Sequence, residues 1–143
     1  GTEANAMKNY YPGDMYVDWL GVSCYPPSLS ATYPEERRYP LTLMQGIKQV
    51  SADKPIMISE GGYSSTCDHQ RWVREWFKLK DEEPRVKAVV WENHKNAVNG
   101  DRRLQSDPLA LELYKELVQD PYWLDLIPDA VYSEIETRKN NSK

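Results

Sequence analysis

The stretch at residues 54–62 reads Lys-Pro-Ile-Met-Ile-Ser-Glu-Gly-Gly, a short apolar run that ends on a carboxylate and two glycines. A run of this length, opened by a proline, is typical of a strand that is buried on both faces, as in a parallel sheet. Glu60 then stands at the carboxyl end of the strand, where parallel α/β folds bind ligands and perform chemistry. Gly61 and Gly62 would let the chain turn sharply there and let a ligand approach. The stretch predicts a functional carboxylate, although a solvated glutamate at a strand end would have the same pattern.

Two further runs have strand character, and a helical pattern follows each of the three strands. The strands are predicted at residues 16–23 and 86–91, which are rich in β-branched and aromatic side chains. Apolar residues at helical spacing predict a helix at residues 41–51, Asp68 is a good N-cap for a second helix, and Asp107 followed by proline begins a third. The order strand then helix, repeated along the chain, predicts an α/β fold with a parallel sheet.

The segments between these elements have no periodicity. We expect long loops at residues 27–40 and 95–106, and a disordered end at residues 138–143. The chain is interpreted as one domain at residues 1–122, followed by a partly disordered tail at residues 123–143.

The composition narrows the class of partner. The chain has 143 residues, 40% of them apolar, and carries 18 Lys and Arg against 22 Asp and Glu, so its net charge of −4 argues against nucleic acid as a partner. It contains no apolar run long enough to span a membrane and no signal-peptide pattern, which leaves the compartment open. Cys24 and Cys67 are too few for a disulfide scaffold, match no metal motif, and could form a single bridge. No cofactor and no metal are predicted.

The aromatic set is unusual, because the chain has ten Tyr and five Trp but one Phe. Tyr and Trp combine a flat apolar face with a polar edge, which suits stacking on sugar rings as well as half-buried core positions. Trp72 and Trp76 stand four residues apart on the second predicted helix, and this spacing favours core packing for them. The composition by itself therefore indicates carbohydrate only weakly.

Three motifs occur in order: Tyr-Tyr-Pro-Gly-Asp-x-Tyr-Val-Asp-Trp-x-Gly-Val-Ser-x-Tyr at residues 10–25, Lys-Pro-Ile-Met-Ile-Ser-Glu at 54–60, and Val-Lys-Ala-Val-Val-Trp-x-Asn at 86–93. Together they resemble the C-terminal part of glycoside hydrolase family twenty-six. The resemblance implies a secreted clan A (β/α)8 barrel that acts on β-mannan, mixed-linkage β-glucan or xylan, with the motifs as strands six to eight. A whole barrel needs about 250 residues. The fold class expected is thus α/β, a partial TIM barrel of three parallel βα units.

The resemblance also implies a site. Glu60 matches the catalytic nucleophile, and Tyr25 matches the tyrosine whose hydroxyl would hydrogen-bond that carboxylate and orient it. Trp91 matches an aromatic residue that would stack under the sugar, with Tyr63 and Asn93 as further substrate contacts. The expected ligand is a β-linked polysaccharide.

Three positions depart from the family's pattern. Gly61 replaces a bulky apolar residue, and Glu92 and Arg102 each replace an aromatic residue. Such departures are expected in a module that is no longer selected for turnover.

A retaining glycosidase needs two carboxyl groups about 5–5.5 Å apart. The resembled family carries its acid/base glutamate on the fourth strand, which has no counterpart among these residues, and Glu92 on a neighbouring strand is a poor substitute. His69 and His94 are interpreted as exposed polar residues. We therefore expect part of a retaining endo-β-glycanase that is inactive alone. Its open sheet, with an inner face of aliphatic and aromatic side chains, would need an N-terminal half-barrel, a second copy or the tail at residues 120–137 to cover it.

Two other interpretations stay open. A non-catalytic carbohydrate-binding or scaffold module would use Tyr25, Tyr63 and Trp91 as a stacking platform, with Glu60 as a hydrogen-bond acceptor. An unrelated doubly wound domain would also have βα units, but the sequence has no Gly-rich phosphate loop.

Overall fold

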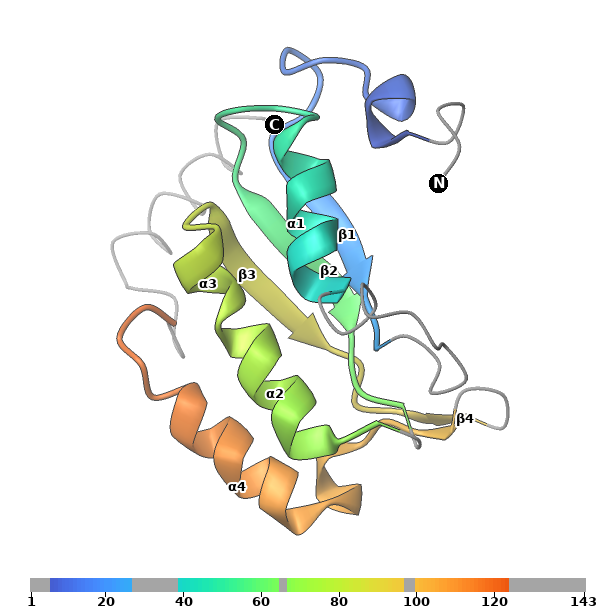
Figure 1. Cartoon of the computed structure of the whole chain (residues 1–143), viewed down its shortest axis with the longest axis vertical. Helices are drawn as coiled ribbons and strands as arrows, with labels where there is room; N and C mark the ends of the chain where they lie inside the picture. The colour runs from blue at the N-terminus through green and yellow to red at the C-terminus, as the bar shows by residue number, and fades with distance from the viewer. Residues whose placement is uncertain (1–5, 27–38, 65–66, 97–99, 124–143) are drawn as a thin grey trace, which may run out of the picture.

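The computed structural model describes residues 6–26, 39–64, 67–96 and 100–123. These residues form an α/β fold around a three-stranded parallel sheet in the order β1-β2-β3 (Figure 1). The strands are β1 (Leu20–Cys24), β2 (Ile56–Gly61) and β3 (Val86–Trp91), and the helices are α1 (Tyr39–Lys48), α2 (His69–Phe77), α3 (Leu79–Glu82) and α4 (Pro108–Leu117). The predicted α/β class and parallel sheet are confirmed.

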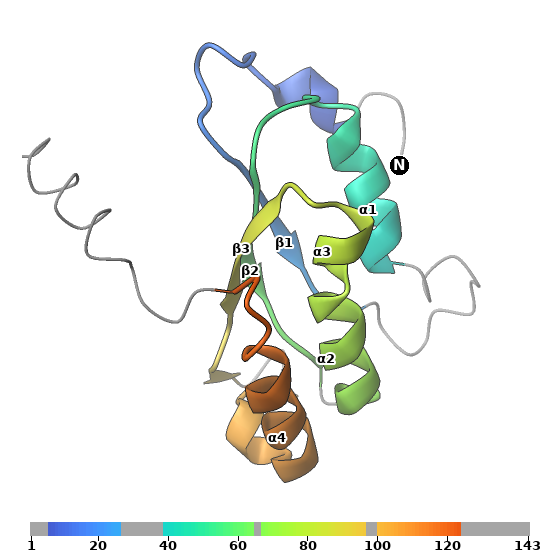
Figure 2. The same ribbon diagram turned by 90° about the vertical axis from the view of Figure 1, so that its left-hand side faces the viewer.

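The helices of the described ranges cover one face of the sheet. Figure 2 shows α1, α2 and α3 on the same side of the three strands, with none of the described helices on the other side. Along β2, Ile56 and Ile58 are buried against the helices, while Ser59 and Glu60 are exposed. The prediction of a strand buried on both faces was therefore wrong, because the apolar run of β2 alternates between a helix-covered face and an open one.

The open face is more polar than expected. Gly21 and Ser23 of β1 and Ser59 of β2 are exposed, and Val90 of β3 is 48% exposed. Aliphatic and aromatic side chains were predicted there, but the large ones of these strands mostly turn toward the helices. Since small and hydroxyl side chains tolerate water, the open face costs less free energy than predicted. The segment proposed to cover it, residues 120–137, lies outside the described residues from position 124 onward.

The backbone hydrogen bonds between neighbouring strands determine where each strand begins and ends. β1 begins at Leu20 rather than at residue 16, because the first ladder bond runs from the Leu20 N–H to the Pro55 carbonyl and earlier residues have no partner on β2. β3 has the predicted bounds. The register brings Cys24, Gly61 and Trp91 side by side, so the carboxyl ends of all three strands lie at one edge of the sheet.

The helix starts agree with the capping signals. Asp68 accepts a hydrogen bond from the Arg71 N–H at the start of α2, and Asp107 caps α4 ahead of Pro108. The helix predicted from residue 41 begins at Tyr39 instead, and the second predicted helix is interrupted between α2 and α3. Trp72 and Trp76 are buried in the core, as their spacing predicted.

Four short elements were not predicted. The segment expected to be a loop at residues 95–106 contains an antiparallel pair, β4 (Lys95–Asn96) with β5 (Gly100–Asp101), and the 3-10 helix η4 (Leu104–Ser106). A second 3-10 helix, η2 (Met7–Tyr10), precedes β1. Elements this short leave no periodic pattern in a sequence. The loop expected at residues 27–40 falls outside the described residues as far as position 38.

Both cysteines are free thiols, so the single bridge that the sequence left open does not form. Burial raises the pKa of the Cys24 thiol to about 12, which keeps it protonated and unreactive. Within the described residues, no helix combines the length and the apolar character that a membrane span requires.

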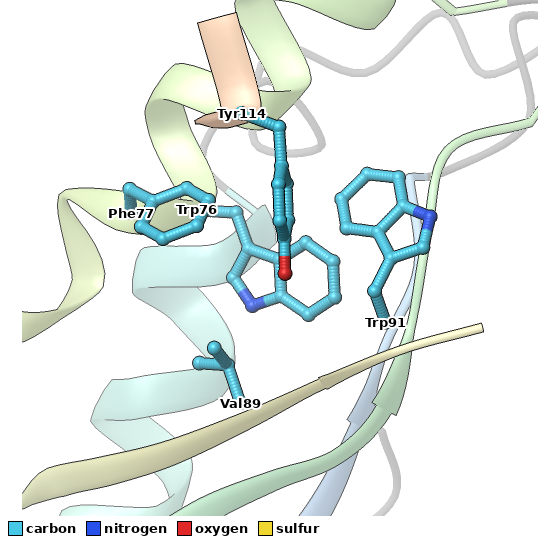
Figure 3. A pocket seen from close by; sticks show the side chains of 5 residues that line it. All are labelled: Trp76, Phe77, Val89, Trp91 and Tyr114. Atoms are coloured by element: carbon cyan, nitrogen blue, oxygen red, sulfur yellow. The ribbon is translucent and has the colours of Figure 1, made fainter. Parts of the chain in front are cut away.

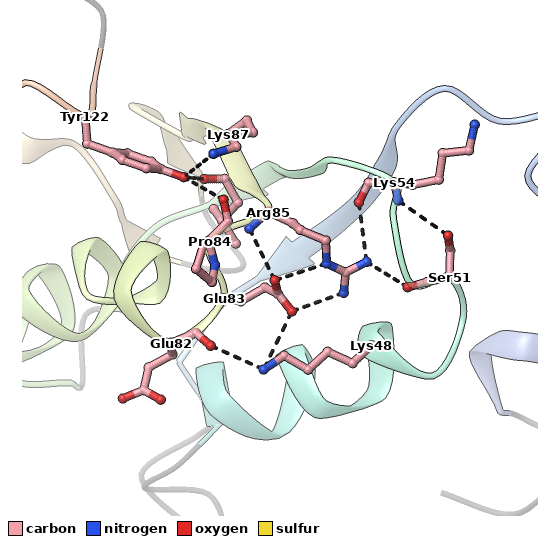
Figure 4. Close-up of polar contacts among 10 residues, drawn as sticks. Lys48, Ser51, Lys54, Glu82, Glu83, Pro84, Arg85, Lys87 and Tyr122 are labelled. Carbon is pink, nitrogen blue, oxygen red and sulfur yellow. Dashed lines mark hydrogen bonds and ion pairs between the residues drawn. The ribbon is translucent and has the colours of Figure 1, made fainter.

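An ionic network joins the loops at the amino ends of the strands (Figure 4). Arg85 binds both carboxylate oxygens of Glu83, at 3.0 and 3.1 Å, and donates to the Ser51 carbonyl at 2.7 Å. Lys48 of α1 adds an ion pair to Glu83 at 3.6 Å. Glu83 is only 5% exposed, so its charge depends on these partners. The network ties the loop before β3 to the loop before β2.

We predict that Arg85→Met lowers the free energy of unfolding by about 3 kcal/mol, because it leaves the buried Glu83 carboxylate without its main partner. Urea denaturation at pH 7 measures this. The matched control is Lys115→Met, which removes an exposed ion pair with Glu112 on α4 and should leave stability unchanged. Equal effects of the two substitutions would contradict a structural role for the network.

The same pair predicts a pH dependence. Hydrogen bonds from Arg85 hold the pKa of Glu83 below its ordinary value. A lowered pKa stabilises the fold above the unfolded value of about 4.3, and this contribution is lost as the pH falls through the folded value. The stability difference between the wild type and Arg85→Met should therefore shrink when the pH is lowered from 7 toward 3.

Gly61 is required by close packing at the carboxyl ends. A Cβ on Gly61 would lie 2.4 Å from the Cys24 carbonyl oxygen and 3.0 Å from the Trp76 ring, whereas a Cβ on Gly62 would meet nothing closer than 3.6 Å. The departure of Gly61 from the resembled pattern thus has a local cause, since a larger residue does not fit beside Trp76.

We predict that Gly61→Ala destabilises the protein by roughly 1–3 kcal/mol, because β1 or Trp76 must move. Gly62→Ala is the matched control one residue away and should change stability by less than about 1 kcal/mol. Urea denaturation of both variants gives the comparison, and a Gly61→Ala variant as stable as Gly62→Ala would refute the packing argument.

Candidate functional site

Glu60 and Tyr25 meet at the carboxyl edge of the sheet. Glu60 is the second-last residue of β2 and is exposed beside Ser23, and Tyr25 follows β1, the parallel neighbour of β2. The Tyr25 hydroxyl donates to Glu60 Oε1 at 2.6 Å, and Ser23 Oγ lies 3.5 Å from Glu60 Oε2. The hydrogen bond expected between Tyr25 and Glu60 is therefore present, on a carboxylate that is exposed to solvent.

A second carboxylate contacts the same tyrosine. The Tyr25 hydroxyl is 2.9 Å from Oε2 of Glu92, which directly follows β3. Arg102, after β5, forms an ion pair with that Glu92 oxygen and places its guanidinium 4.1 Å from the centre of the Tyr25 ring. Arg102 is 9% exposed. We call Tyr25, Glu60, Glu92 and Arg102 the carboxylate site.

The pairing of Glu92 with Arg102 was missed by the sequence analysis. Each was noted as a departure from the resembled pattern, in which both positions carry aromatic residues. The signal in the sequence was their opposite charge. When a glutamate and an arginine each stand where the resembled pattern has an aromatic residue, the two can form a new ion pair.

The charges of the site shift two pKa values. Burial, hydrogen bonds to Glu60 and Glu92, and their negative charges raise the pKa of Tyr25 well above its ordinary value, so its hydroxyl keeps its hydrogen. Burial favours the neutral form of Glu92, but hydrogen bonds from Arg102 and Tyr25 outweigh it and lower the pKa of Glu92. Glu92 is therefore ionised at neutral pH.

Trp91 lies behind the sheet rather than beside Glu60. Its indole packs against Trp76 and Tyr114 on the side of α2 and α4, with ring centroids 4.5 and 5.6 Å away (Figure 3). The indole N–H donates to the Arg102 carbonyl at 2.9 Å. The structure does not bring Trp91 together with Glu60, and it makes the indole a support for the backbone that carries Arg102.

Tyr63 and Asn93 are also occupied by internal contacts. Tyr63 is fully buried, and its hydroxyl donates to the Arg103 carbonyl at 2.6 Å. The Asn93 side chain accepts a hydrogen bond from the Leu104 N–H at 2.8 Å, although the residue as a whole is exposed. Both residues hold the segment that contains Arg102, and neither contacts Glu60.

His69 was expected to be exposed, and that expectation was wrong. Its ring stacks on Tyr63 with centroids 3.8 Å apart, and its side chain is 19% exposed. One ring nitrogen lies 3.0 Å from Asp107 and the other 3.0 Å from the Ser64 carbonyl. His69 thus links the loop after β2 to the start of α4, whereas His94 is exposed as expected.

We predict that Asp107→Ala destabilises the protein by about 1 kcal/mol, because it removes the N-cap of α4. Asp107→Asn should keep most of the stabilisation from the N-cap, since asparagine is also a good N-cap residue. Because asparagine lacks the charge that faces His69, the stability still missing in Asp107→Asn measures what the negative charge of Asp107 contributes beside His69. Thermal unfolding of the two variants, each with and without His69→Gln, separates the contributions. An Asp107→Asn effect that persists unchanged in the His69→Gln background would exclude the pair.

Within the described residues, no group of three or more His, Cys, Asp or Glu side chains could hold a metal ion. The carboxylate site has a phenol and a guanidinium as donors and two carboxylates as acceptors. Such groups suit hydrogen bonding, and carboxylates and phenols can also transfer protons.

No model of a known protein family matches this sequence, and no curated protein matches it significantly.

Proposed function

We propose that this chain is the part of a retaining endo-β-glycanase barrel, similar to glycoside hydrolase family twenty-six, that comprises strands six to eight. Glu60 is its nucleophile, and β-mannan or mixed-linkage β-glucan is its substrate class. The observation that carries the proposal is the 2.6 Å hydrogen bond from Tyr25 to Glu60 at the carboxyl end of the central strand. A phenol that donates to a carboxylate keeps it oriented and favours its charged form, which a nucleophile needs.

The sheet supports the proposal in its layout. A (β/α)8 barrel has helices outside and strands inside, and its chemistry lies at the carboxyl ends of the strands. Strands β1, β2 and β3 are parallel, and α1, α2 and α3 lie on one side of them. Glu60 is exposed near the carboxyl end of β2, with Ser23 and Tyr25 as its neighbours. Among the described residues, β1 and β3 each pair on one side only, so both edges are open to neighbouring strands.

The same site explains why we propose that the chain is inactive alone. Glu60 and Glu92 both contact one hydroxyl, so their nearest oxygens lie at most about 5.5 Å apart, no farther than the two carboxyl groups of a retaining pair. The second carboxyl must nevertheless be protonated to serve as the acid. Arg102 keeps Glu92 ionised, so the proton donor has to come from other strands of the barrel, in the same polypeptide or in another chain.

The carbohydrate-platform alternative has less support. The guanidinium of Arg102 covers one face of the Tyr25 ring, the indole of Trp91 packs toward the helices, and Tyr63 is buried. A stacking platform needs free aromatic faces that lie in one plane.

The test joins this chain to strands one to five of a family member, which supply the acid/base glutamate. We expect the chimera to release reducing sugar from β-mannan or mixed-linkage β-glucan, and Glu60→Gln to reduce the rate by roughly three orders of magnitude or more. Glu112→Gln removes the same charge from the exposed face of α4 and is the matched control.

The purified chain by itself should release no sugar. Hydrolysis by the free chain that Glu60→Gln abolishes would overturn the proposed inactivity. A chimera that is folded by circular dichroism yet inactive would overturn the proposed reaction.

A further inference from the structure

One hydroxyl hydrogen serves two carboxylates in the carboxylate site. Oε1 of Glu60 lies 2.6 Å and Oε2 of Glu92 lies 2.9 Å from the Tyr25 oxygen. A phenol has a single hydrogen, so it donates fully to one acceptor at a time. The two carboxylates therefore compete for the hydrogen bond that orients Glu60.

Arg102 acts on one side of this competition. Its guanidinium pairs with the same Glu92 oxygen that faces Tyr25, and it neutralises the charge there. Within the described residues, the contacts of the Glu60 carboxylate come from the hydroxyls of Tyr25 and Ser23 and not from a cation. A carboxylate whose charge no cation neutralises is the stronger acceptor, so the hydrogen goes to Glu60, which also lies closer to the Tyr25 oxygen.

Arg102 is also held rigidly enough for this role. It is 9% exposed, its stem packs where Gly62 has no side chain, and the Trp91 indole N–H binds its carbonyl. Its guanidinium lies over the Tyr25 ring, which limits rotation of the phenol. Besides Tyr25, Glu60 and Arg102, the exposed His94 also lies near Glu92 and favours its charged form.

We infer that Arg102 is a positioning residue that directs the Tyr25 hydroxyl hydrogen to Glu60 by satisfying Glu92. Without Arg102, an uncompensated Glu92 would take the hydrogen and leave Glu60 disoriented. The catalytic meaning of this arrangement rests on the proposed function, but the arrangement itself can be tested without any glycan. Either idea can therefore fail while the other holds.

The experiment is NMR of the full chain with carbon-13 in the Glu carboxyl groups and in the Tyr ring carbon that bears the hydroxyl, at pH 7. Glu60→Gln, Glu92→Gln and Tyr25→Phe assign the signals. Arg102→Met keeps the bulk of the side chain and removes its charge. We expect Arg102→Met to shift the Glu60 and Tyr25 signals away from their wild-type positions. Each shift should be at least half of the displacement that Tyr25→Phe causes in the Glu60 signal.

The decisive variant combines Arg102→Met with Glu92→Gln. If Arg102 acts by satisfying Glu92, the double variant returns both signals to their wild-type positions, and Arg102→Lys, which keeps the charge, stays close to them. If Arg102 only packs against Tyr25, the double variant stays where Arg102→Met is, and the inference is wrong. Unchanged signals in Arg102→Met would also overturn it. If Arg102→Met does not fold, Arg102→Lys and Glu92→Gln are compared instead. Glu60 and Tyr25 signals that move in Arg102→Lys but not in Glu92→Gln would contradict a role for charge.

Discussion

The contact between Gly61 and the Cys24 carbonyl determines how closely β1 and β2 approach at their carboxyl ends. No side chain fits between them, and Trp76 closes the space from the helix side. This approach places the residue after β1 within hydrogen-bond distance of the last polar side chain of β2. Because hydrogen bonds weaken steeply beyond about 3.2 Å, a small shift of either strand would separate Tyr25 from Glu60. The packing behind the sheet thus sets the geometry in front of it.

The two ends of the sheet use charge differently. At the amino ends, Arg85 and Glu83 form a buried and fully paired network that joins loops. At the carboxyl ends, Glu60 is exposed and has hydroxyl partners, while the charge of Glu92 is matched by Arg102. A paired network stabilises a fold, and a carboxylate without a cation stays available to a ligand. This division is the usual one in parallel α/β proteins, in which one edge holds the structure and the other performs chemistry.

The aromatic residues stabilise the site from behind. Trp91, Trp76, Tyr63 and Tyr114 form contacts between the sheet, α2 and α4, and none of them contacts Glu60. Their apolar area supports the segment with Arg102, through the Trp91 and Tyr63 bonds to carbonyls of that segment. The abundance of Tyr and Trp in the sequence is therefore explained at these positions by packing with a polar edge, the other use that these side chains serve well.

The sequence by itself determined the α/β class, the bounds of β3, the caps of α2 and α4, and the place of Glu60 at the end of a strand. These features depend on local patterns that act over a few residues, such as the spacing of apolar side chains and an aspartate, with or without a following proline, at the start of a helix. The contact of Tyr25 with Glu60 was an expectation from the family resemblance, and the alignment of the strand ends in the structure produces it.

Only the tertiary structure decided which face of the sheet is open, where the Trp91 ring points, and that Glu92 and Arg102 form a pair around Tyr25. The open face is decided by where the helices pack. When helices cover one face only, successive side chains of an apolar strand alternate between buried and exposed positions. Residues 92 and 102 flank the antiparallel pair β4 and β5, whose two-residue strands have no sequence signature. Two opposite charges attract strongly only when they are close in space, and Glu92 and Arg102 become close only when the three strands are aligned.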